Sequence, residues 1–540
     1  MTGLASRAQR SHGQLMPPVA VSFWRLIERR PRASALVLGV LSATGFQPLG
    51  LWPLAILAMA AFAALVASSE TPGRAAWLGW LFGMGHFTLG NCWIATAFTH
   101  QAAMPAVLGW AAVPLLSVYL AVYPALAAVG ARGLAGRGLG WPFALAFAGC
   151  WIVSEQLRSV VFTGYAWNPF AMVLLGPFDR PGLAMLAPFM GTYALSGLAV
   201  LAAAAAAIAL RGRHWIGLAI GAAVMVAGMV WPAAPGQDGT LRVTLVQPDL
   251  PQAAINDPAR FEDNFQQLAR LSAPRDGAAQ RLVLWPESGL ADYLRPGYPQ
   301  HYYDRMTAMG DPALARARIG RTIGAGSLLL TGAVDLEIEQ GRAIGAYNGI
   351  MAIDADGAIA GGYAKAHLVP YGEYLPMRPL LEPLGLSRLV PGAIDFFPGP
   401  GPRTLDLGAY GRAAMQICYE IVFSGEVVQR GARPDYIFNP SNDGWFGAFG
   451  PPQHLAQARM RAVEEGLPVL RSTTTGISAV IDARGVVRDH LGMNRAGRID
   501  TLVPPAAPPT LFSRLGNLLP LLWAVLCLVG AVVAIRRQAR

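Results

Sequence analysis

Long apolar stretches dominate the first 236 residues of this 540-residue chain, and one more lies near its end. A helix needs about 20 mostly apolar residues to cross the hydrocarbon layer of a membrane, where charged residues are costly. The sequence therefore predicts a polytopic helical membrane domain with about eight spans. They are expected at approximately 33–50, 52–69, 75–98, 105–131, 141–157, 183–210, 215–233 and 515–535.

Acidic residues are concentrated between these stretches. Only four of the 32 acidic residues precede position 237, and none follows Asp500. We therefore expect an N-terminal membrane domain of seven spans at 1–236, a water-soluble domain at 237–510, and a C-terminal spanning helix with its tail at 511–540. An ordinary soluble enzyme is excluded, because only 14% of the residues are charged.

Arginine residues indicate the orientation of the chain. Loops rich in Lys and Arg stay in the cytoplasm, and with eight spans all the basic loops fall on one side. Examples are Arg74 between spans two and three, Arg132 and Arg137 between four and five, and Arg211 and Arg213 between six and seven. The soluble domain is then expected on the periplasmic or extracellular side. The net charge of +10 reflects this topology signal, and no nucleic-acid partner is expected.

Short β-rich stretches alternate with helical stretches in the soluble part. The segment 257–271 places Phe261, Phe265 and Leu268 near helical spacing. Strands separated by helices predict a layered α/β domain. The expected strands lie at 241–246, 281–285, 327–334, 348–354, 413–417, 435–438 and 477–481.

A loop rich in proline and glycine is expected at 390–402, and it carries Phe396 and Phe397. Exposing two aromatic rings to water is costly, so they need an apolar partner. Either the loop dips into lipid or covers a lipid tail, or both rings pack back on the core. The sequence leaves both alternatives open.

Cys418 is the single cysteine of the soluble part, because Cys92, Cys150 and Cys527 lie in predicted spans. A structural disulfide is therefore not expected. An unpaired thiol in such a place is either a buried core residue or a nucleophile. Its position at the end of a strand-like stretch favours a nucleophile, because a strand end holds the sulfur rigidly toward a cleft.

A thiol attacks only as the thiolate, so it needs a base and a positive charge nearby. Glu287 follows a predicted strand in Trp285-Pro286-Glu287, and it is either the general base or an exposed loop residue. Lys365 is the only lysine in a chain that otherwise uses arginine, which indicates that its compact ammonium is required.

Motifs for metal ligands, nucleotide phosphates or a serine nucleophile are not visible, so neither a metal nor a cofactor is expected.

Four motifs, in this order, resemble those of the nitrilase (carbon-nitrogen hydrolase) superfamily. They are LVLWPES at 282–288, KAHLVPYGEYLP at 365–376, ICYE at 417–420 and NPSNDGWFG at 439–447. With spans on both sides, nearly the whole chain closely resembles the apolipoprotein N-acyltransferase family. This resemblance implies an α-β-β-α sandwich domain on the periplasmic face of a bacterial inner membrane, with Glu287 as general base, Cys418 as nucleophile and Lys365 stabilising the tetrahedral intermediate.

The same resemblance implies supporting roles for further residues. They would hold the triad, shape the pocket around the thiol, form the loop beside it, or face it from the membrane side. These residues are Glu373, Tyr419, Glu420, Trp285, Asn442, Trp445, Phe446 and Trp167.

The resemblance also implies a two-step acyl transfer. The thiolate would take a fatty acyl chain from a phospholipid and hold it as a thioester, and the N-terminal amine of S-diacylglyceryl cysteine in an apolipoprotein would then accept it. The expected partners are these two lipid substrates, and the protein is expected to be a monomer. Two alternatives are a membrane-tethered amidase or nitrilase that hydrolyses a small amide, and a membrane assembly factor that only binds lipoproteins.

Overall fold

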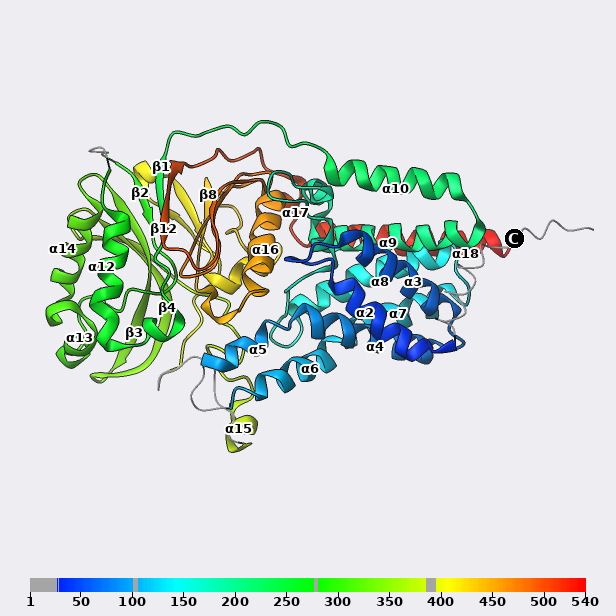
Figure 1. The fold of residues 1–540 in the computed structure, drawn as a ribbon, viewed down its shortest axis with the longest axis horizontal. Coiled ribbons are helices and arrows are strands. Elements are labelled where there is room, and N and C mark those ends of the chain that lie inside the picture. Colours follow the sequence, from blue (N-terminus) through cyan, green and yellow to red (C-terminus); the bar gives the residue numbers. More distant parts are fainter. Residues whose placement is uncertain (1–26, 28, 101–104, 276–279, 385–394) are drawn as a thin grey trace, which may run out of the picture.

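A body of helices joins a domain of two β-sheets in the computed structural model, which describes residues 27, 29–100, 105–275, 280–384 and 395–540 (Figure 1). Each apolar stretch predicted from the sequence is largely helical. The helices of the body are α2 (Pro31–Ala43), α3 (Trp52–Ser68), α4 (Pro72–Gly90), α5 (Ile94–Ala97), α6 (Leu108–Leu120), α7 (Val122–Ala135), α8 (Trp141–Val160), α9 (Ala187–Gly212), α10 (Trp215–Val230), α17 (Leu511–Leu515) and α18 (Leu518–Gln538). The first helix ends earlier than predicted, because Gly45, Pro48 and Gly50 favour turns.

Within the residues that the structure describes, three helical segments are long and apolar enough to cross a membrane, judged by length and composition. They are Leu108–Ala135, Leu183–Gly212 and Leu518–Gln538, while α2, α3 and α10 are apolar but shorter. Apolar side chains on the outside of the body suit contact with lipid, as shown by Ile216 of α10, which is 80% exposed. The structure thus supports several apolar spanning helices, and the count of eight stays a prediction.

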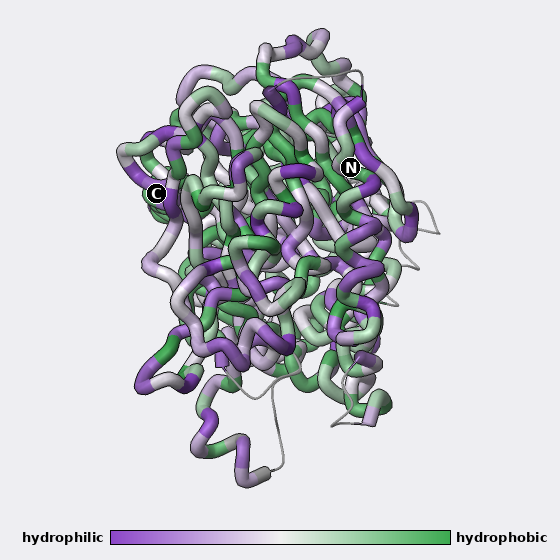
Figure 2. Tube along the Cα trace, turned by 90° about the vertical axis from the view of Figure 1, so that its left-hand side faces the viewer, coloured by the Kyte–Doolittle hydropathy of each residue, from purple (hydrophilic) through white to green (hydrophobic). Residues whose placement is uncertain are grey.

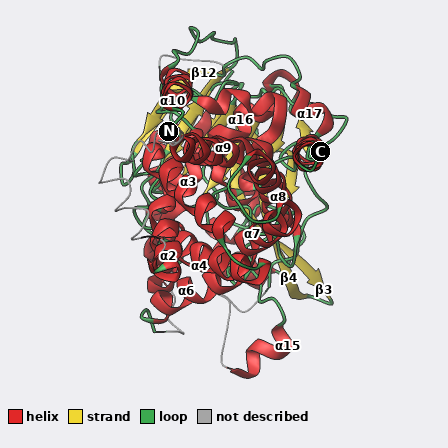
Figure 3. Ribbon diagram, turned by 90° about the vertical axis from the view of Figure 1, so that its right-hand side faces the viewer, coloured by secondary structure: helices red, strands yellow, loops and turns green. Residues whose placement is uncertain are grey.

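Helices α2 and α4 pack closely against each other at glycine residues. A Cβ atom on Gly39 of α2 would lie 2.0 Å from the carbonyl oxygen of Phe82, and one on Gly85 of α4 would lie 2.1 Å from that of Leu36. The two backbones therefore touch, as small residues permit between membrane helices. Seen from the end opposite the sheets, the helices of the body lie in front of the strands (Figure 3).

Two six-stranded sheets form the other part of the molecule, with the orders β12-β1-β2-β3-β4-β5 and β11-β10-β9-β8-β7-β6. The first contains β1 (Arg242–Gln247), β2 (Leu282–Leu284), β3 (Leu328–Glu339), β4 (Arg342–Asp354), β5 (Ile359–Ala364) and β12 (Gly497–Leu502). The second contains β6 (Thr404–Asp406), β7 (Arg412–Met415), β8 (Tyr436–Ser441), β9 (Val469–Thr473), β10 (Ser478–Ile481) and β11 (Val487–Leu491). All seven predicted strands are confirmed. The pattern did not predict β5, β6, β9, β11 and β12, several of which are short or carry charged residues.

The sheets pack face to face, and helices cover their outer faces. Side chains from both sheets, such as Leu284 and Met415, form one buried cluster between them. Helices α12 (Phe261–Ser272) and α14 (Pro312–Ile323) pack on the outside of the first sheet, and α16 (Gly450–Glu465) packs on the outside of the second. The predicted helix at 257–271 is thus confirmed as α12. Viewed from the sheet end, hydrophilic segments of the chain alternate with hydrophobic ones (Figure 2).

The two phenylalanines of the proline- and glycine-rich loop contact β4. Residues 390–394 of this loop lie outside the described residues, whereas Phe396 forms a backbone bridge with Ala346. The ring of Phe397 lies over Gly345, where an added Cβ atom would come within 2.2 Å of it. Both phenylalanines are half-buried, which supports the alternative in which they pack back on the core.

Helix α16 fastens the sheet domain to the helical body through buried polar groups. Arg459 donates a hydrogen bond to the carbonyl oxygen of Gly176 at 2.8 Å. Arg461 donates to the hydroxyl oxygen of Thr192 at 2.6 Å, and that hydroxyl donates to Glu464 at 2.5 Å. Because unpaired buried charges are strongly unfavourable, these bonds fix how α16 sits on α9.

We expect Gly85→Ala to destabilise the protein, because its new methyl group would meet the Leu36 carbonyl oxygen at 2.1 Å. Overpacking of this kind costs about 1–3 kcal/mol. Gly73→Ala, on the same helix, is the matched control, since nothing lies within 4 Å of a Cβ atom there. Thermal unfolding in detergent should show a lower melting temperature for Gly85→Ala only. Equal melting temperatures of the two variants would contradict the close helix contact.

Candidate active site

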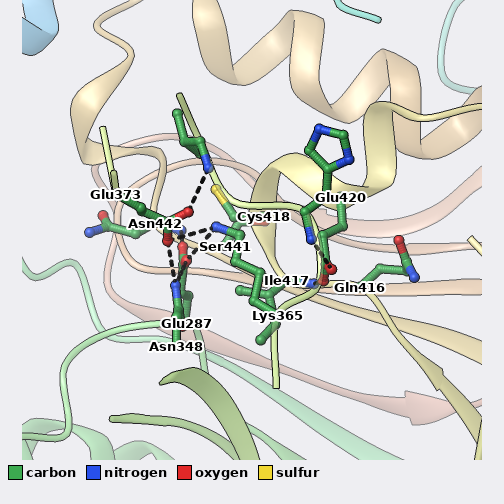
Figure 4. A network of polar contacts seen from close by, with 12 residues as sticks. Glu287, Asn348, Lys365, Glu373, Gln416, Ile417, Cys418, Glu420, Ser441 and Asn442 are labelled. Atoms are coloured by element: carbon green, nitrogen blue, oxygen red, sulfur yellow. Dashed lines mark hydrogen bonds and ion pairs between the residues drawn. The ribbon is translucent and has the colours of Figure 1, made fainter. Parts of the chain in front are cut away.

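The three residues expected to form a triad follow strands of the two sheets and converge in space (Figure 4). Glu287 lies beyond the end of β2, Lys365 directly follows β5, and Cys418 lies beyond the end of β7. Strand ends are rigid, so each side chain is held at a defined position. The predicted neighbours Glu373 and Asn442 are in the same cluster.

A buried lysine pairs with two carboxylates in this cluster. Lys365 Nζ lies 3.0 Å from Glu373 Oε1 and 3.5 Å from Glu287 Oε1, and the lysine side chain is only 1% exposed. Burial opposes its charge, but the carboxylates of Glu373 and Glu287 outweigh burial and raise the pKa of Lys365. Lys365 therefore carries a positive charge throughout the neutral pH range.

Hydrogen bonds hold both oxygen atoms of the Glu287 carboxylate and both oxygen atoms of the Glu373 carboxylate. Asn348 Nδ2 donates hydrogen bonds to the Oε1 atoms of Glu287 and Glu373, each at 2.8 Å. The amide of Asn442 donates to Glu287 Oε2 at 2.9 Å, and that of Val369 donates to Glu373 Oε2 at 2.7 Å. These bonds fix the direction in which the carboxylate of Glu287 faces.

Cys418 lies on a sharp turn between β7 and the short helix η8 (Cys418–Val422). Its φ of 50° is in the left-handed region, which non-glycine residues rarely adopt. Burial and the carboxylate of Glu287 raise the pKa of the Cys418 thiol well above its usual range, and Lys365 opposes them only in part. The thiol is therefore protonated at rest, and reaction requires a base.

Glu420 connects the turn that carries Cys418 to the segment that carries Lys365. Its Oε2 atom accepts from the amide of Ile417 at 2.7 Å, and its Oε1 atom accepts from the amide of Ala366 and the hydroxyl of Tyr363, also at 2.7 Å. Burial raises the pKa of Glu420 to about 7. This residue joins the two sheets beside the thiol.

Trp167, which was expected on the membrane side, lies near Phe446 and Trp445, which were expected in the loop beside the active site. Trp167 is fully buried, and its Nε1 atom donates to Gln453 of α16 at 2.8 Å. The ring of Phe446 lies 5.8 Å from that of Trp167, and the ring of Trp445 lies 5.7 Å from that of His100. These rings lie where the loop after β8 meets the helical body.

Tyr419 and Trp285 are placed differently from each other. Tyr419 is buried, with its ring 5.1 Å from that of Phe423. Trp285 packs on the outer face of the first sheet, where its Nε1 atom donates to Ser272 at 2.7 Å. The structure therefore does not bring Trp285 into the cluster around Cys418.

Residues that the sequence did not predict complete the cluster. Asn348 lies within β4, and a network of His454, Asp443 and Arg471 lies behind Cys418. Asp443 belongs to one of the quoted motifs, but His454 is one of eight histidines and no spacing marks it. Among the residues that the structure describes, no group of three or more His, Cys, Asp or Glu side chains is arranged to hold a metal ion.

Comparison with known proteins shows the family of the chain. Residues 38–205 match the family model of the apolipoprotein N-acyltransferase N-terminal domain, and residues 242–501 match that of the carbon-nitrogen hydrolases. The apolipoprotein N-acyltransferase of Rhodopseudomonas palustris is 35% identical, over 90% of this chain and 91% of its own. The chain belongs to the apolipoprotein N-acyltransferase family.

The apolipoprotein N-acyltransferase of Caulobacter vibrioides is 34% identical, over 95% of this chain and 96% of its own. These relatives confirm the resemblance to apolipoprotein N-acyltransferases that the four motifs indicated. Among solved structures, an amidase from Nesterenkonia sp. is 18% identical and aligns with a TM-score of 0.31, over 50% of this chain and 92% of its own.

We expect Asn348→Asp to destabilise the protein by about 3 kcal/mol at neutral pH, because it places a third carboxylate beside two others and removes their shared donor. The neighbouring charges raise the pKa of the introduced carboxyl group above its value in the unfolded chain. The native state then binds this proton more tightly, so the deficit shrinks as the pH falls through that raised pKa.

Unfolding measured at pH 5 and pH 8 checks this expectation. Asn494→Asp is the matched control, because it makes the same change of charge at an exposed position. Equal unfolding free energies for the two variants at pH 8 would contradict the role of Asn348 in holding the carboxylates.

Proposed function

We propose that the protein transfers a fatty acyl chain from a membrane phospholipid to the N-terminal amine of S-diacylglyceryl cysteine in an apolipoprotein. The product is a mature triacylated lipoprotein, and the acyl chain passes through a thioester on Cys418. The observation that supports this most strongly is a buried thiol beside Glu287 and Lys365, in a domain fastened to an apolar helical body. The names of the family members agree with this reaction.

In the first half-reaction, Glu287 accepts the proton of the Cys418 thiol, and the sulfur attacks the ester carbonyl carbon of the phospholipid. A carbon–sulfur bond forms, and negative charge develops on the carbonyl oxygen, which Lys365 and nearby backbone amides stabilise. The carbon–oxygen bond to the glycerol then breaks. Glu287 returns the proton to the leaving lyso-phospholipid, so that a neutral alcohol departs.

In the second half-reaction, the amine of the lipoprotein attacks the thioester carbon. A carbon–nitrogen bond forms, the carbon–sulfur bond breaks, and Glu287 accepts the proton that the amine loses. That proton then returns to the Cys418 sulfur, which restores the resting thiol. Splitting the transfer into two steps in this way lowers the barrier of each.

The membrane arrangement is also part of the proposal. We infer about eight spans, with the membrane domain at 1–236, the catalytic domain at 237–510 on the periplasmic side of a bacterial inner membrane, and the last span and tail at 511–540. Helix α18 carries Arg536 and Arg537 in its last turn, and the C-terminus that follows lies at the end of the body farthest from the sheets (Figure 1). Basic residues at that end favour a cytoplasmic location for it. We expect the protein to act as a monomer.

Transfer of an acyl chain from phospholipid vesicles to a synthetic diacylated lipopeptide tests the proposal. The expected products are lyso-phospholipid and triacylated lipopeptide in equal amounts. Release of ammonia or free acid from a small amide, without lyso-phospholipid, would instead identify a membrane-tethered amidase or nitrilase. A protein that only binds the lipopeptide would give neither set of products.

Cys418→Ser is expected to lower the rate of this transfer by more than about a thousandfold, because a hydroxyl group is far harder to deprotonate than a thiol. The substitution is nearly isosteric, so the melting temperature should change little. Cys527→Ser, which alters a cysteine on α18, is the control and should retain full activity. Transfer by Cys418→Ser at the wild-type rate would exclude Cys418 as the nucleophile.

Lys365→Arg is expected to lower the rate by about a hundredfold or more, although the positive charge is retained. The ammonium lies on two carboxylate oxygens at 3.0 and 3.5 Å in a buried site, and a larger planar guanidinium does not fit the same position. The rate of thioester formation should fall with the overall rate. Normal turnover by this variant would contradict the requirement for a compact ammonium.

A further inference from the structure

The carbonyl oxygen of Cys418 is held from behind by two side chains. His454 of α16 places its Nε2 atom 3.0 Å from this oxygen, and Asn439 of β8 donates to it from Nδ2 at 3.4 Å. A carbonyl oxygen only accepts hydrogen bonds, so His454 Nε2 must carry a proton. The peptide group that follows the thiol therefore has a fixed orientation.

The imidazole ring of His454 is itself locked in place. Its Nδ1 atom lies 2.9 Å from Asp443 Oδ1 and 3.0 Å from Arg471 Nη2, and Arg471 donates to both oxygens of Asp443, at 2.7 and 2.9 Å. The side chains of all three residues are fully buried. Burial and Arg471 lower the pKa of His454, whereas Asp443 and the Cys418 carbonyl group raise it.

Fixing this carbonyl also fixes the next amide. The peptide bond between Cys418 and Tyr419 is trans, so its N–H points away from its C=O. The amide of Tyr419 belongs to the first turn of η8, and the first N–H groups of a helix have no partner within the helix. This donor is on the residue next to Cys418, and it points away from the Cys418 carbonyl oxygen.

We propose that His454 is a positioning residue: by holding the Cys418 carbonyl, it aims the Tyr419 amide at the oxyanion of the tetrahedral intermediate. The inference rests on the proposed role of Cys418 as the acylated nucleophile. Asp443 and Arg471 act one step further back, because they set the position of the imidazole. A donor that is oriented before reaction stabilises the developing charge without reorganisation.

The helical body also contacts this assembly. The ring of Trp167 lies 5.3 Å from that of His454. Its Nε1 atom donates a hydrogen bond to Gln453, the residue before His454. Trp167 therefore packs against the imidazole from the side of the helical body.

Two reactions of Cys418 distinguish a positioning role of His454 from a role in packing alone. Acylation by phosphatidylethanolamine–phosphatidylglycerol vesicles passes through an oxyanion, whereas alkylation by iodoacetamide does not. His454→Leu is expected to slow acylation about a hundredfold while alkylation, measured from pH 6 to 9, stays within about threefold of the wild-type rate. His454→Gln should recover most of the acylation rate, because its amide offers one donor and one acceptor.

Arg459→Met is the structural control, because Arg459 lies on the same helix and is equally buried but contacts carbonyl groups such as that of Gly176 instead. It should lower the melting temperature and change the rates of both reactions in parallel.

Should His454→Leu fail to fold, His454→Asn is the substitute. The asparagine amide is shorter than the imidazole and does not reach the Cys418 carbonyl, so this variant should show the same selective loss of acylation.

Wild-type acylation by His454→Leu or His454→Asn would overturn the proposal. Equal loss of acylation and alkylation, without recovery in His454→Gln, would overturn it as well and assign His454 to packing alone. Failure of the proposed function is a different result, in which the wild-type protein is alkylated at Cys418 but never acylated by the vesicles.

Discussion

A lysine that is 1% exposed must be paired, and Lys365 meets Glu287 and Glu373 at 3.5 and 3.0 Å. Removing one partner of such a buried pair costs about 3–5 kcal/mol, so the segments after β2 and β5 are held together at this point. Burial raises the pKa of the Cys418 thiol, and the carboxylate of Glu287 raises it further. Proton transfer from the sulfur to Glu287 leaves the total charge of the cluster unchanged, and no ion has to enter the buried site.

Helix α16 relates this site to the membrane part of the molecule. One side of it contacts the Cys418 carbonyl through His454, and another meets the body through Arg459 and Arg461. The two lipid substrates that we propose must reach the thiol from the membrane. A helix that contacts both the nucleophile turn and α9 keeps the distance between thiol and body constant, so reactivity does not depend on a flexible linker.

The sequence was sufficient to predict site residues that belong to local patterns. It was insufficient to predict those that only folding brings to the site. Glu287 and Cys418 stand just past apolar strand-like stretches, and Lys365 is unique in composition, so local reasoning made all three candidates, and their roles were predicted from the family resemblance. Asn348 is an ordinary polar position inside β4, and His454 lies on a helix with no local mark, because only tertiary packing brings them to the site. Hydropathy predicted the positions of the helices. It did not determine the number of membrane spans, because several apolar helices are shorter than a membrane-spanning helix usually is.

Mass spectrometry of the purified protein, incubated with phospholipid vesicles but without an acceptor, tests the central claim most directly. The account predicts an added acyl mass on the peptide that contains Cys418, and its loss when a diacylated lipopeptide with a free N-terminal amine is added. The triacylated lipopeptide should appear in the same amount. An unmodified Cys418 peptide under conditions in which the lipopeptide is acylated would contradict the account, because transfer would then bypass the thioester.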